Sequence, residues 1–300
     1  VPLWLRAGRQ SLGRSAAAEA LAQIEQGLTD LQQIEPSRDR DSLEIDLQTC
    51  LALASMAHRG YTAEETERAH LRARELLASF DVDPRHSHVL HGLCTLYGGQ
   101  ARFHEFLDIA GELVKRAEQD GDSEAMCAGY RSMAVGYNSR GEFRQAHEAV
   151  SVAAKHYDPL AHRQSAQRFA QDVGVANMVH LAIAKQFLGQ VDTAAQLIED
   201  FMTLAHDLNH SNTLGYAYLW ACFLRLSRRD FVGAIATAEK MRSMAIESAM
   251  PERLRQSALF KGAALVAIEG SAEEGIAMIE ENLTISRTLY MNTMYPTFPR

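Results

Sequence analysis

The feature that most constrains the fold is an arrangement of small and large residues at helical spacing that returns along the whole sequence. The segment from Met126 to Ala154 shows it clearly. Its large side chains are Tyr130, Tyr137 and Phe143, its small ones are Ala134 and Ala146, and Gly141 stands between the two halves. Small residues let two helices cross closely, and large ones fill the space between them. The segment therefore predicts two helices packed together across a tight turn.

The position just inside the second helix of each pair marks the repeat. It is occupied by Ala20, Ala69, Phe106, Ala146, Ala194, Ala234 and Gly275, at intervals of 49, 37, 40, 48, 40 and 41 residues. A single helix pair cannot bury its apolar face, so neighbouring pairs must stack to form a core. We therefore expect an all-α protein, a right-handed α-solenoid of about seven helix pairs that forms a single domain over residues 1–300.

Proline and cysteine positions agree with this expectation. The interior prolines fall between the predicted helices, at Pro36, Pro84, Pro159 and Pro251. No segment shows sustained alternation of polar and apolar residues, so no strand is predicted. The cysteines stand far apart, at Cys50, Cys94, Cys127 and Cys222, each among apolar residues. We expect them to be reduced thiols in the core.

Charge and hydropathy narrow the range of partners and locations. The net charge of −8 gives no general attraction to phosphate backbones, so we expect no nucleic-acid partner. No apolar run approaches the roughly 18 residues that cross a bilayer, and the N-terminus does not have the pattern of a signal peptide. A cytoplasmic protein without a membrane partner is therefore expected. The chain opens at Val1 rather than at a methionine, which suggests a fragment of a longer protein.

The spacing within each pair resembles that of the tetratricopeptide (TPR) repeat. The usual period of that repeat is about 34 residues, so the repeats of this chain are longer than usual. In TPR repeats the first helix of each pair lines the concave face of the solenoid. The resemblance therefore implies a groove along the first helices.

Two segments resemble the C-terminal TPR region of bacterial signalling proteins that join a class III adenylate/guanylate cyclase domain to an ATPase module. The first is Trp4-Leu5-Arg6-Ala7-Gly8, followed by Ala17 to Ala20. The second runs from Tyr157-Asp158-Pro159 through His162-Arg163 to Gln171-Asp172-Val173-Gly174-Val175, where the family usually has Pro in place of Val173. The resemblance covers nearly the whole chain but only the TPR part of the family. The cyclase and ATPase parts are absent, so their catalytic residues map onto nothing here.

Catalytic and metal-binding patterns are weak in this sequence. The segment from Gly8 to Ser15 has the spacing of a phosphate-binding loop, but Arg14 stands in the lysine position and the preceding residues are helical. His88 and His91 lie three residues apart near His86 and His104, without an obvious fourth ligand. We therefore expect no catalytic residue, no metal and no cofactor.

The groove residues implied by the TPR resemblance are the candidate binding residues. They are His88, His91, Thr95, Arg131, Val135, Asn138, Val179, Ile183, Gln186, Tyr216, Leu219, Phe223, Leu226 and Phe260. Arg131 and Asn138 are suited to hold a peptide carboxylate or backbone. The later positions are apolar and aromatic, which is typical of a partner site. The alternative is that a tight superhelix or a neighbouring subunit already covers this surface.

Three functions fit the sequence. The first is a non-catalytic interaction module of a cyclase-type signalling protein, which binds a peptide, a partner protein or another domain of its parent on the concave face. The second is the effector-sensing arm of an ATP-dependent transcriptional regulator. The third is a metal-dependent enzyme built on the histidines. A homodimer is also plausible, through the apolar groove or the apolar C-terminal segment from Leu289 to Phe298.

Overall fold

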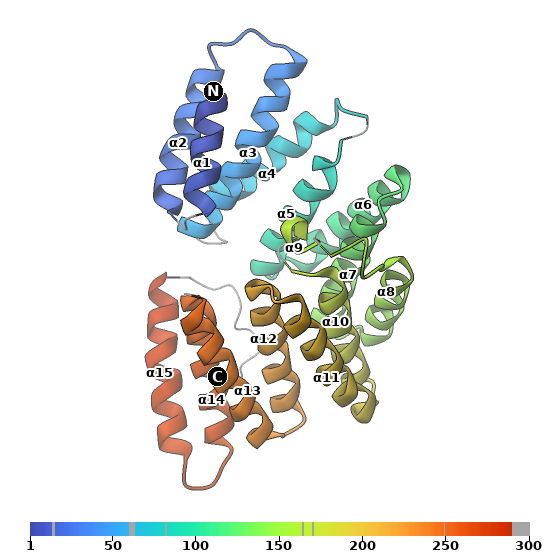
Figure 1. The fold of residues 1–300 in the computed structure, drawn as a ribbon, viewed down its shortest axis with the longest axis vertical. Helices are drawn as coiled ribbons and strands as arrows, with labels where there is room; N and C mark the ends of the chain where they lie inside the picture. The colour runs from blue at the N-terminus through green and yellow to red at the C-terminus, as the bar shows by residue number, and fades with distance from the viewer. Residues whose placement is uncertain are drawn as a thin grey trace. The chain divides into compact units, whose positions relative to one another are not determined.

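The computed structural model describes residues 1–13, 16–59, 64–81, 83–163, 165–169, 171–248 and 250–289. Within these residues all regular secondary structure is helical (Figure 1), as the sequence predicts. The helices are α1 (Pro2–Gly13), α2 (Ala17–Leu31), α3 (Arg38–Arg59), α4 (Glu64–Leu77), α5 (Arg85–Gly99), α6 (Phe103–Asp120), α7 (Ser123–Ser139), α8 (Phe143–His156), α9 (Ser165–Phe169), α10 (Val173–Phe187), α11 (Val191–Leu208), α12 (Ser211–Ser227), α13 (Phe231–Glu247), α14 (Pro251–Val266) and α15 (Ala272–Leu289).

Apart from the five-residue helix α9, the helices follow one another as seven pairs. The pairs are α1/α2, α3/α4, α5/α6, α7/α8, α10/α11, α12/α13 and α14/α15. The seven residues predicted at the close crossing of each pair, from Ala20 to Gly275, are all buried. The predicted repeat register is therefore confirmed.

The described chain forms two compact units. The first runs from Val1 to Asp120 and holds α1 to α6, and the second runs from Gly121 to Thr288 and holds the later helices. The expectation of a single continuous domain over residues 1–300 stays a prediction. The apolar C-terminal segment given above as a dimer contact lies, from Tyr290 onward, outside the described residues.

The turns between paired helices require a left-handed backbone conformation. Gly141 and Gly189 adopt it, with φ of 77° and 84°, at the junctions α7/α8 and α10/α11. At the equivalent junction α12/α13 the same conformation is taken by Arg229, with φ of 63°. A side chain there costs energy that glycine avoids. The tight turn expected at Gly141 is therefore confirmed, and Arg229 is a strained variant of it.

The third pair carries Phe106 where the other pairs have a small residue. Its ring lies over Gly98 of α5, where an added Cβ would stand 3.0 Å from the Phe106 ring. The large residue on one helix is therefore matched by a residue without a side chain on the other. The sulfur of Cys94 lies 4.0 Å from the carbonyl oxygen of Phe106, and Cys222 repeats this contact with Ala234. All four cysteines are buried free thiols, as expected.

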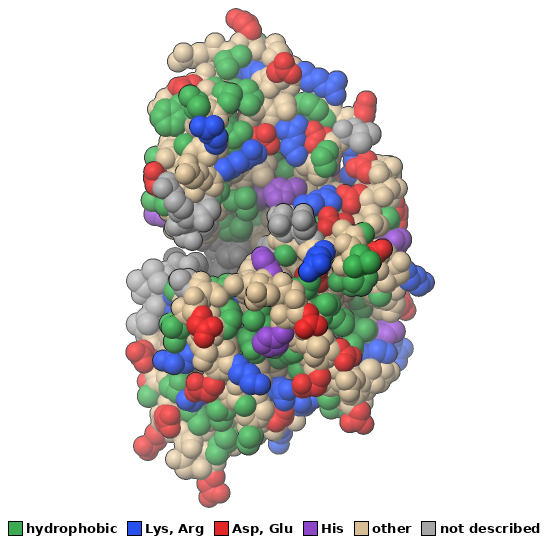
Figure 2. Space-filling view, viewed as in Figure 1, with side chains coloured by type: hydrophobic (Ala, Val, Ile, Leu, Met, Phe, Trp, Pro, Cys, Tyr) green, Lys and Arg blue, Asp and Glu red, His purple; other side chains and the backbone are tan. Residues whose placement is uncertain are grey.

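Charged side chains on the face shown in Figure 2 are scattered rather than gathered by sign. Acidic and basic groups alternate over each unit, which is the pattern of a solvated surface. Among the described helices, none combines the length and the apolar character needed to cross a membrane.

Candidate functional site

In the second unit, the predicted groove residues Asn138 and Tyr216 are connected by hydrogen bonds to one histidine, His180. Asn138 of α7 donates from Nδ2 to the carbonyl oxygen of His180 on α10 at 3.2 Å. The His180 ring nitrogen Nε2 lies 2.7 Å from the hydroxyl oxygen of Tyr216 on α12. His180 was not predicted as a site residue, yet it joins the first helices of three successive pairs. We call Arg131, Asn138, His180, Tyr216 and Trp220 the Tyr216 cluster.

The hydrogen bonds of the cluster fix the tautomer of His180. The amide nitrogen of Asn138 is held as a donor by the His180 carbonyl, and it also lies 3.4 Å from His180 Nδ1. Nδ1 therefore faces a donor and must carry a lone pair rather than a proton. Burial lowers the pKa of His180 to about 3, with a further contribution from the Arg131 charge, so the ring is neutral. The single ring proton is consequently on Nε2 and is donated to Tyr216.

Two arginines set the electrostatics of the cluster. Burial raises the pKa of Tyr216, while the charge and hydrogen bond of Arg131 and the charge of Arg253 lower it. Arg131 is itself nearly buried, with 8% of its surface exposed. Arg253 of α14 reaches the cluster across Gly215, where an added Cβ would stand 3.2 Å from its Nε. Arg131 and Arg253 are therefore the charged groups that act on the Tyr216 hydroxyl.

Aromatic rings continue from the cluster along the same helices. Trp220 packs edge-on to His180 with ring centroids 5.5 Å apart, and Phe223 packs edge-on to Trp220 at 5.5 Å. Phe187 lies 6.4 Å from Phe223 and stacks on Phe143 at 4.8 Å. Phe187 is 45% exposed. This row forms a partly exposed apolar surface next to the polar cluster.

The other predicted groove residues of the second unit lie mainly in the packing between helices. Val179 and Ile183 are buried in the core formed by α10, α11 and α12. Gln186 is also buried and donates to the Leu224 carbonyl at 3.1 Å and to Ser227. Leu219 is partly buried in a cluster with Tyr218 and Met241. Phe260 is buried on α14. Their role in binding a ligand stays a prediction.

In the first unit, the predicted residue His88 lines a shallow hollow of about 240 Å³. The hollow is lined by Arg9, Leu12, Asp46, Thr49, Cys50, Leu53, Arg85 and His88, from α1, α3, the start of α5 and its first turns. Arg9 and Arg85 form ion pairs with Asp46 at 3.2 and 3.5 Å. The two arginines that line the hollow are therefore both paired with its one aspartate. His91, the neighbouring predicted residue, is nearly buried.

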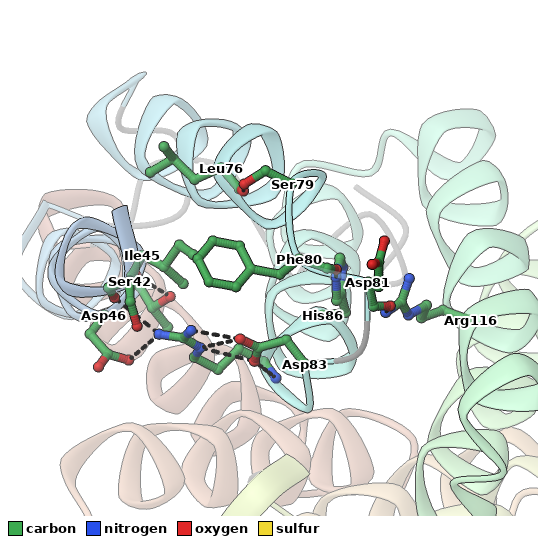
Figure 3. Close-up of polar contacts among 12 residues, drawn as sticks. Ser42, Ile45, Asp46, Leu76, Ser79, Phe80, Asp81, Asp83, His86 and Arg116 are labelled. Atoms are coloured by element: carbon green, nitrogen blue, oxygen red, sulfur yellow. Dashed lines mark hydrogen bonds and ion pairs between the residues drawn. The ribbon is translucent and has the colours of Figure 1, made fainter. Parts of the chain in front are cut away.

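Arg85 contacts Ser42, Asp46 and Asp83, three of the residues labelled in Figure 3. It donates to the Asp83 carboxylate through Nε and Nη2, to the Ser42 carbonyl at 3.0 Å, and it pairs with Asp46. The guanidinium also lies 5.7 Å from the centre of the Phe80 ring, which packs with Ile45. The hydrogen bonds from Arg85 lower the pKa of Asp83. This arginine ties the start of α5 to α3.

His70 of α4 is a buried group that sequence reasoning missed. It is 1% exposed, and neither ring nitrogen has a hydrogen-bond partner. Its ring lies against Gly92 of α5, where any added Cβ would overlap it. Burial, followed by the nearby His88, lowers the pKa of His70 to about 4. His70 is thus a neutral packing residue at the contact between α4 and α5.

The remaining motifs have structural roles. The part of the phosphate-loop-like segment that the structure describes is helical, and Gly8 packs directly against Ile24, while Arg14 and Ser15 lie outside the described residues. Within the described residues, no group of three or more His, Cys, Asp or Glu side chains is arranged to hold a metal ion. The histidines around His88 therefore do not form such a group there.

In one of the two segments that carry the family resemblance, residues near its start and its end contact each other. The Tyr157 ring lies directly over Gly174, leaving no room for a Cβ. Asp172 caps α10 by accepting from Val175 N at 2.8 Å, and it also accepts from the Ser165 hydroxyl at 3.0 Å. Its own N–H donates to the Thr213 hydroxyl at 3.0 Å. These residues hold the long connection between α8 and α10 and its contact with α12.

Comparisons with known proteins agree with the repeat architecture. No protein-family model matches the chain, and no curated protein matches it. A solved structure of a putative kinesin light chain with nearly identical TPR-like repeats, from Podosopora anserina, is similar over 69% of this chain and 94% of its own, with 19% identity and a TM-score of 0.54.

Two Rap structures are similar over more of the chain. The apo form of RapI matches 93% of this chain and 98% of its own, with 8% identity and a TM-score of 0.61. A Rap protein complexed with Competence and Sporulation Factor matches 96% of this chain and 86% of its own, with 10% identity and a TM-score of 0.61. At these identities the likeness shows the fold alone. The chain has the fold of a TPR-like helical repeat protein.

The residues that sequence reasoning missed share a detectable signal. Helix α10 is mostly apolar, yet it contains the polar residues Asn177, His180 and Gln186, all of them buried. Buried polar side chains in an apolar helix need partners from neighbouring helices. A polar residue within the apolar sequence of a pair's first helix is therefore the signal that could have predicted His180 as a site residue.

Proposed function

We propose that this chain is a non-catalytic interaction module that binds a peptide segment of a partner protein at the Tyr216 cluster and the adjoining aromatic row. The observation that carries the proposal is the contact of His180 with both Asn138 and Tyr216. It places polar groups from three successive first helices side by side, next to partly exposed rings. Polar groups that fix orientation beside aromatic anchors are the usual composition of a peptide-binding surface.

The fold comparisons support an interaction role. TPR-like repeats stack into extended surfaces on which partners bind. One of the similar structures is a Rap protein complexed with Competence and Sporulation Factor, so a protein of this fold can carry a bound partner. On the residues from Tyr157 to Val175 we further propose that the module belongs to a bacterial signalling protein of the cyclase and ATPase type. The partner would then be a protein of the same pathway or another domain of the parent.

Selection from a random displayed-peptide library tests the proposal. Peptides selected on the wild-type chain should share a sequence pattern and should bind the R131A and F223A variants at least tenfold more weakly. The matched control is R144A, since Arg144 is an exposed arginine on α8. Circular dichroism would show that each variant is folded. Selected peptides that bind both site variants as tightly as wild type would overturn the concave-face assignment.

A further inference from the structure

The first unit contains a second and larger hollow, of about 430 Å³, lined by residues of α4, α5 and α6. Its apolar lining includes Leu77, Val89 and Leu90, which are buried core residues. Ala78, directly after α4, also lines it and is exposed, so it presents only a methyl group there. We call this space the Ala78 hollow. A hollow of this volume with apolar walls and a few polar groups is typical of a small-molecule site.

Two of the charged side chains that line the Ala78 hollow are bound to each other. Arg74 of α4 donates to both carboxylate oxygens of Glu112 on α6, from Nε at 3.1 Å and from Nη2. This pair holds one charge of each sign and is neutral as a whole. His86 also lines the hollow, and its Nε2 lies 2.9 Å from the Phe80 carbonyl oxygen, so Nε2 carries the ring proton. In the neutral ring, Nδ1 is therefore a hydrogen-bond acceptor.

The remaining charged group of the lining, Glu75, belongs to a network with more carboxylates than arginines. Its carboxylate lies 3.4 Å from Nη1 of Arg72, and the same guanidinium is bound to Glu44 through Nε at 2.7 Å. Glu44 also contacts Arg40 at 3.4 Å, but Arg40 is shared in turn with Asp41 at 3.6 Å. Three carboxylates thus share two guanidinium groups. The network carries one negative charge in excess, and Glu75 brings that charge to the hollow.

We propose that the Ala78 hollow binds a small organic cation, an ammonium or amidinium group carried on an apolar body. The apolar body packs on the buried leucine and valine side chains, and the cation donates to the Glu75 and Glu112 carboxylates. An anion would meet the excess negative charge, and the arginine of the lining already holds Glu112. The site lies in the first unit, so it does not depend on the peptide-binding function proposed for the second.

Three probes of nearly equal size test the sign of the charge. They are phenethylamine, a cation at neutral pH, 2-phenylethanol, which is neutral, and phenylacetate, an anion. Titration of the full chain is followed by nuclear magnetic resonance of the leucine and valine methyl groups, with a V89I variant to assign the Val89 signals. Phenethylamine should shift these signals in a saturable way, and the alcohol should bind about threefold or more weakly. Equal affinities of the cation and the alcohol, or tighter binding of phenylacetate, would overturn the proposal.

Two charge variants of α4 should change the affinity for phenethylamine in opposite directions. E75Q removes the excess carboxylate and should weaken binding about two- to fivefold, the size expected for a partly exposed ion pair. R74M keeps the apolar part of the arginine but releases Glu112, and should strengthen binding by about the same factor. The matched controls E64Q and R68M remove exposed charges nearer the start of α4 and should leave the affinity unchanged. No change in either E75Q or R74M, or changes of the same sign, would contradict the proposal.

A substitution that fills the hollow tests the location. Ala78 is exposed, so the larger side chain of A78F occupies the hollow without entering the core, and it should abolish the shift of the Val89 signals. S79F is the control, because Ser79 is the next residue and is also exposed. Circular dichroism shows whether each variant is folded. A folded A78F that binds phenethylamine like wild type would overturn the site. If A78F does not fold, E75Q and R74M decide the outcome.

Discussion

Each unit contains a group of hydrogen-bonded polar side chains, one around Arg85 and one around Tyr216, and the two groups differ in their balance of donors and acceptors. In the first unit, Arg85 is surrounded by acceptors: the Asp83 and Asp46 carboxylates and the Ser42 carbonyl. In the second unit, the hydroxyl of Tyr216 is surrounded by donors from His180 and Arg131. Arg85 therefore completes its hydrogen bonds within the protein and fastens α5 to α3. In the Tyr216 cluster, the buried amide oxygen of Asn138 has no hydrogen-bond partner.

This difference separates structural from ligand-binding polar groups. Both centres combine arginine with aromatic rings, and composition alone would treat them alike. The balance of donors and acceptors distinguishes them, because a satisfied network stabilises the fold and an unsatisfied one favours binding. The predictions below test whether this contrast holds, and single-tryptophan variants report on each unit separately, through Trp4 and Trp220.

The largest expected effect concerns His70, the buried histidine of the first unit. Its folded-state pKa of about 4 lies below the unfolded value of about 6.5, so the unfolded chain binds more protons between these values. The burial of the neutral ring therefore contributes fully to the free energy of unfolding above about pH 6.5. This free energy falls by on the order of 3 kcal/mol as the pH drops toward 4. In the H70F variant, denaturant unfolding followed by Trp4 should lose less stability over this range. An unchanged pH dependence would contradict the assignment.

A smaller effect is expected for Arg85. The R85A variant leaves the nearly buried carboxylate of Asp83 without its main partner and should lower the unfolding free energy of the first unit by about 2 kcal/mol. The R131A variant should lower the unfolding free energy of the second unit by about half of that or less, while weakening peptide binding at least tenfold. Urea unfolding of both variants measures the comparison. If R131A destabilised its unit more than R85A does, Arg131 would be the structural arginine of the pair.

The smallest effect is expected at the strained turn. Arg229 has φ of 63° at the turn position where the α7/α8 and α10/α11 pairs have glycine. The R229G variant should stabilise the second unit by about 0.5–1 kcal/mol, because glycine adopts this conformation without strain. G141A, which creates the same strain at the α7/α8 turn, is the reciprocal variant and should be destabilising. Thermal unfolding of both gives the sign, and a destabilised R229G would show that its side chain matters more than its backbone.

The sequence was sufficient for the helix pairs but not for the polar site. The positions from Ala20 to Gly275 follow from local spacing, because a close helix crossing needs a small side chain on at least one helix, which is Gly98 where the position itself carries Phe106. His180 and Arg253 depend on which helices pack side by side, which spacing within one pair does not reveal. The TPR resemblance implies that Val179 and Ile183 line the groove. The structure buries them because they lie on the side of α10 that faces α11 and α12.

Titration calorimetry with a selected peptide tests the central claim most directly. The account predicts that the R131A and F223A variants bind the peptide at least tenfold more weakly than wild type, while the R144A control binds it with unchanged affinity. Equal affinities of the wild-type, R131A and F223A chains would contradict it.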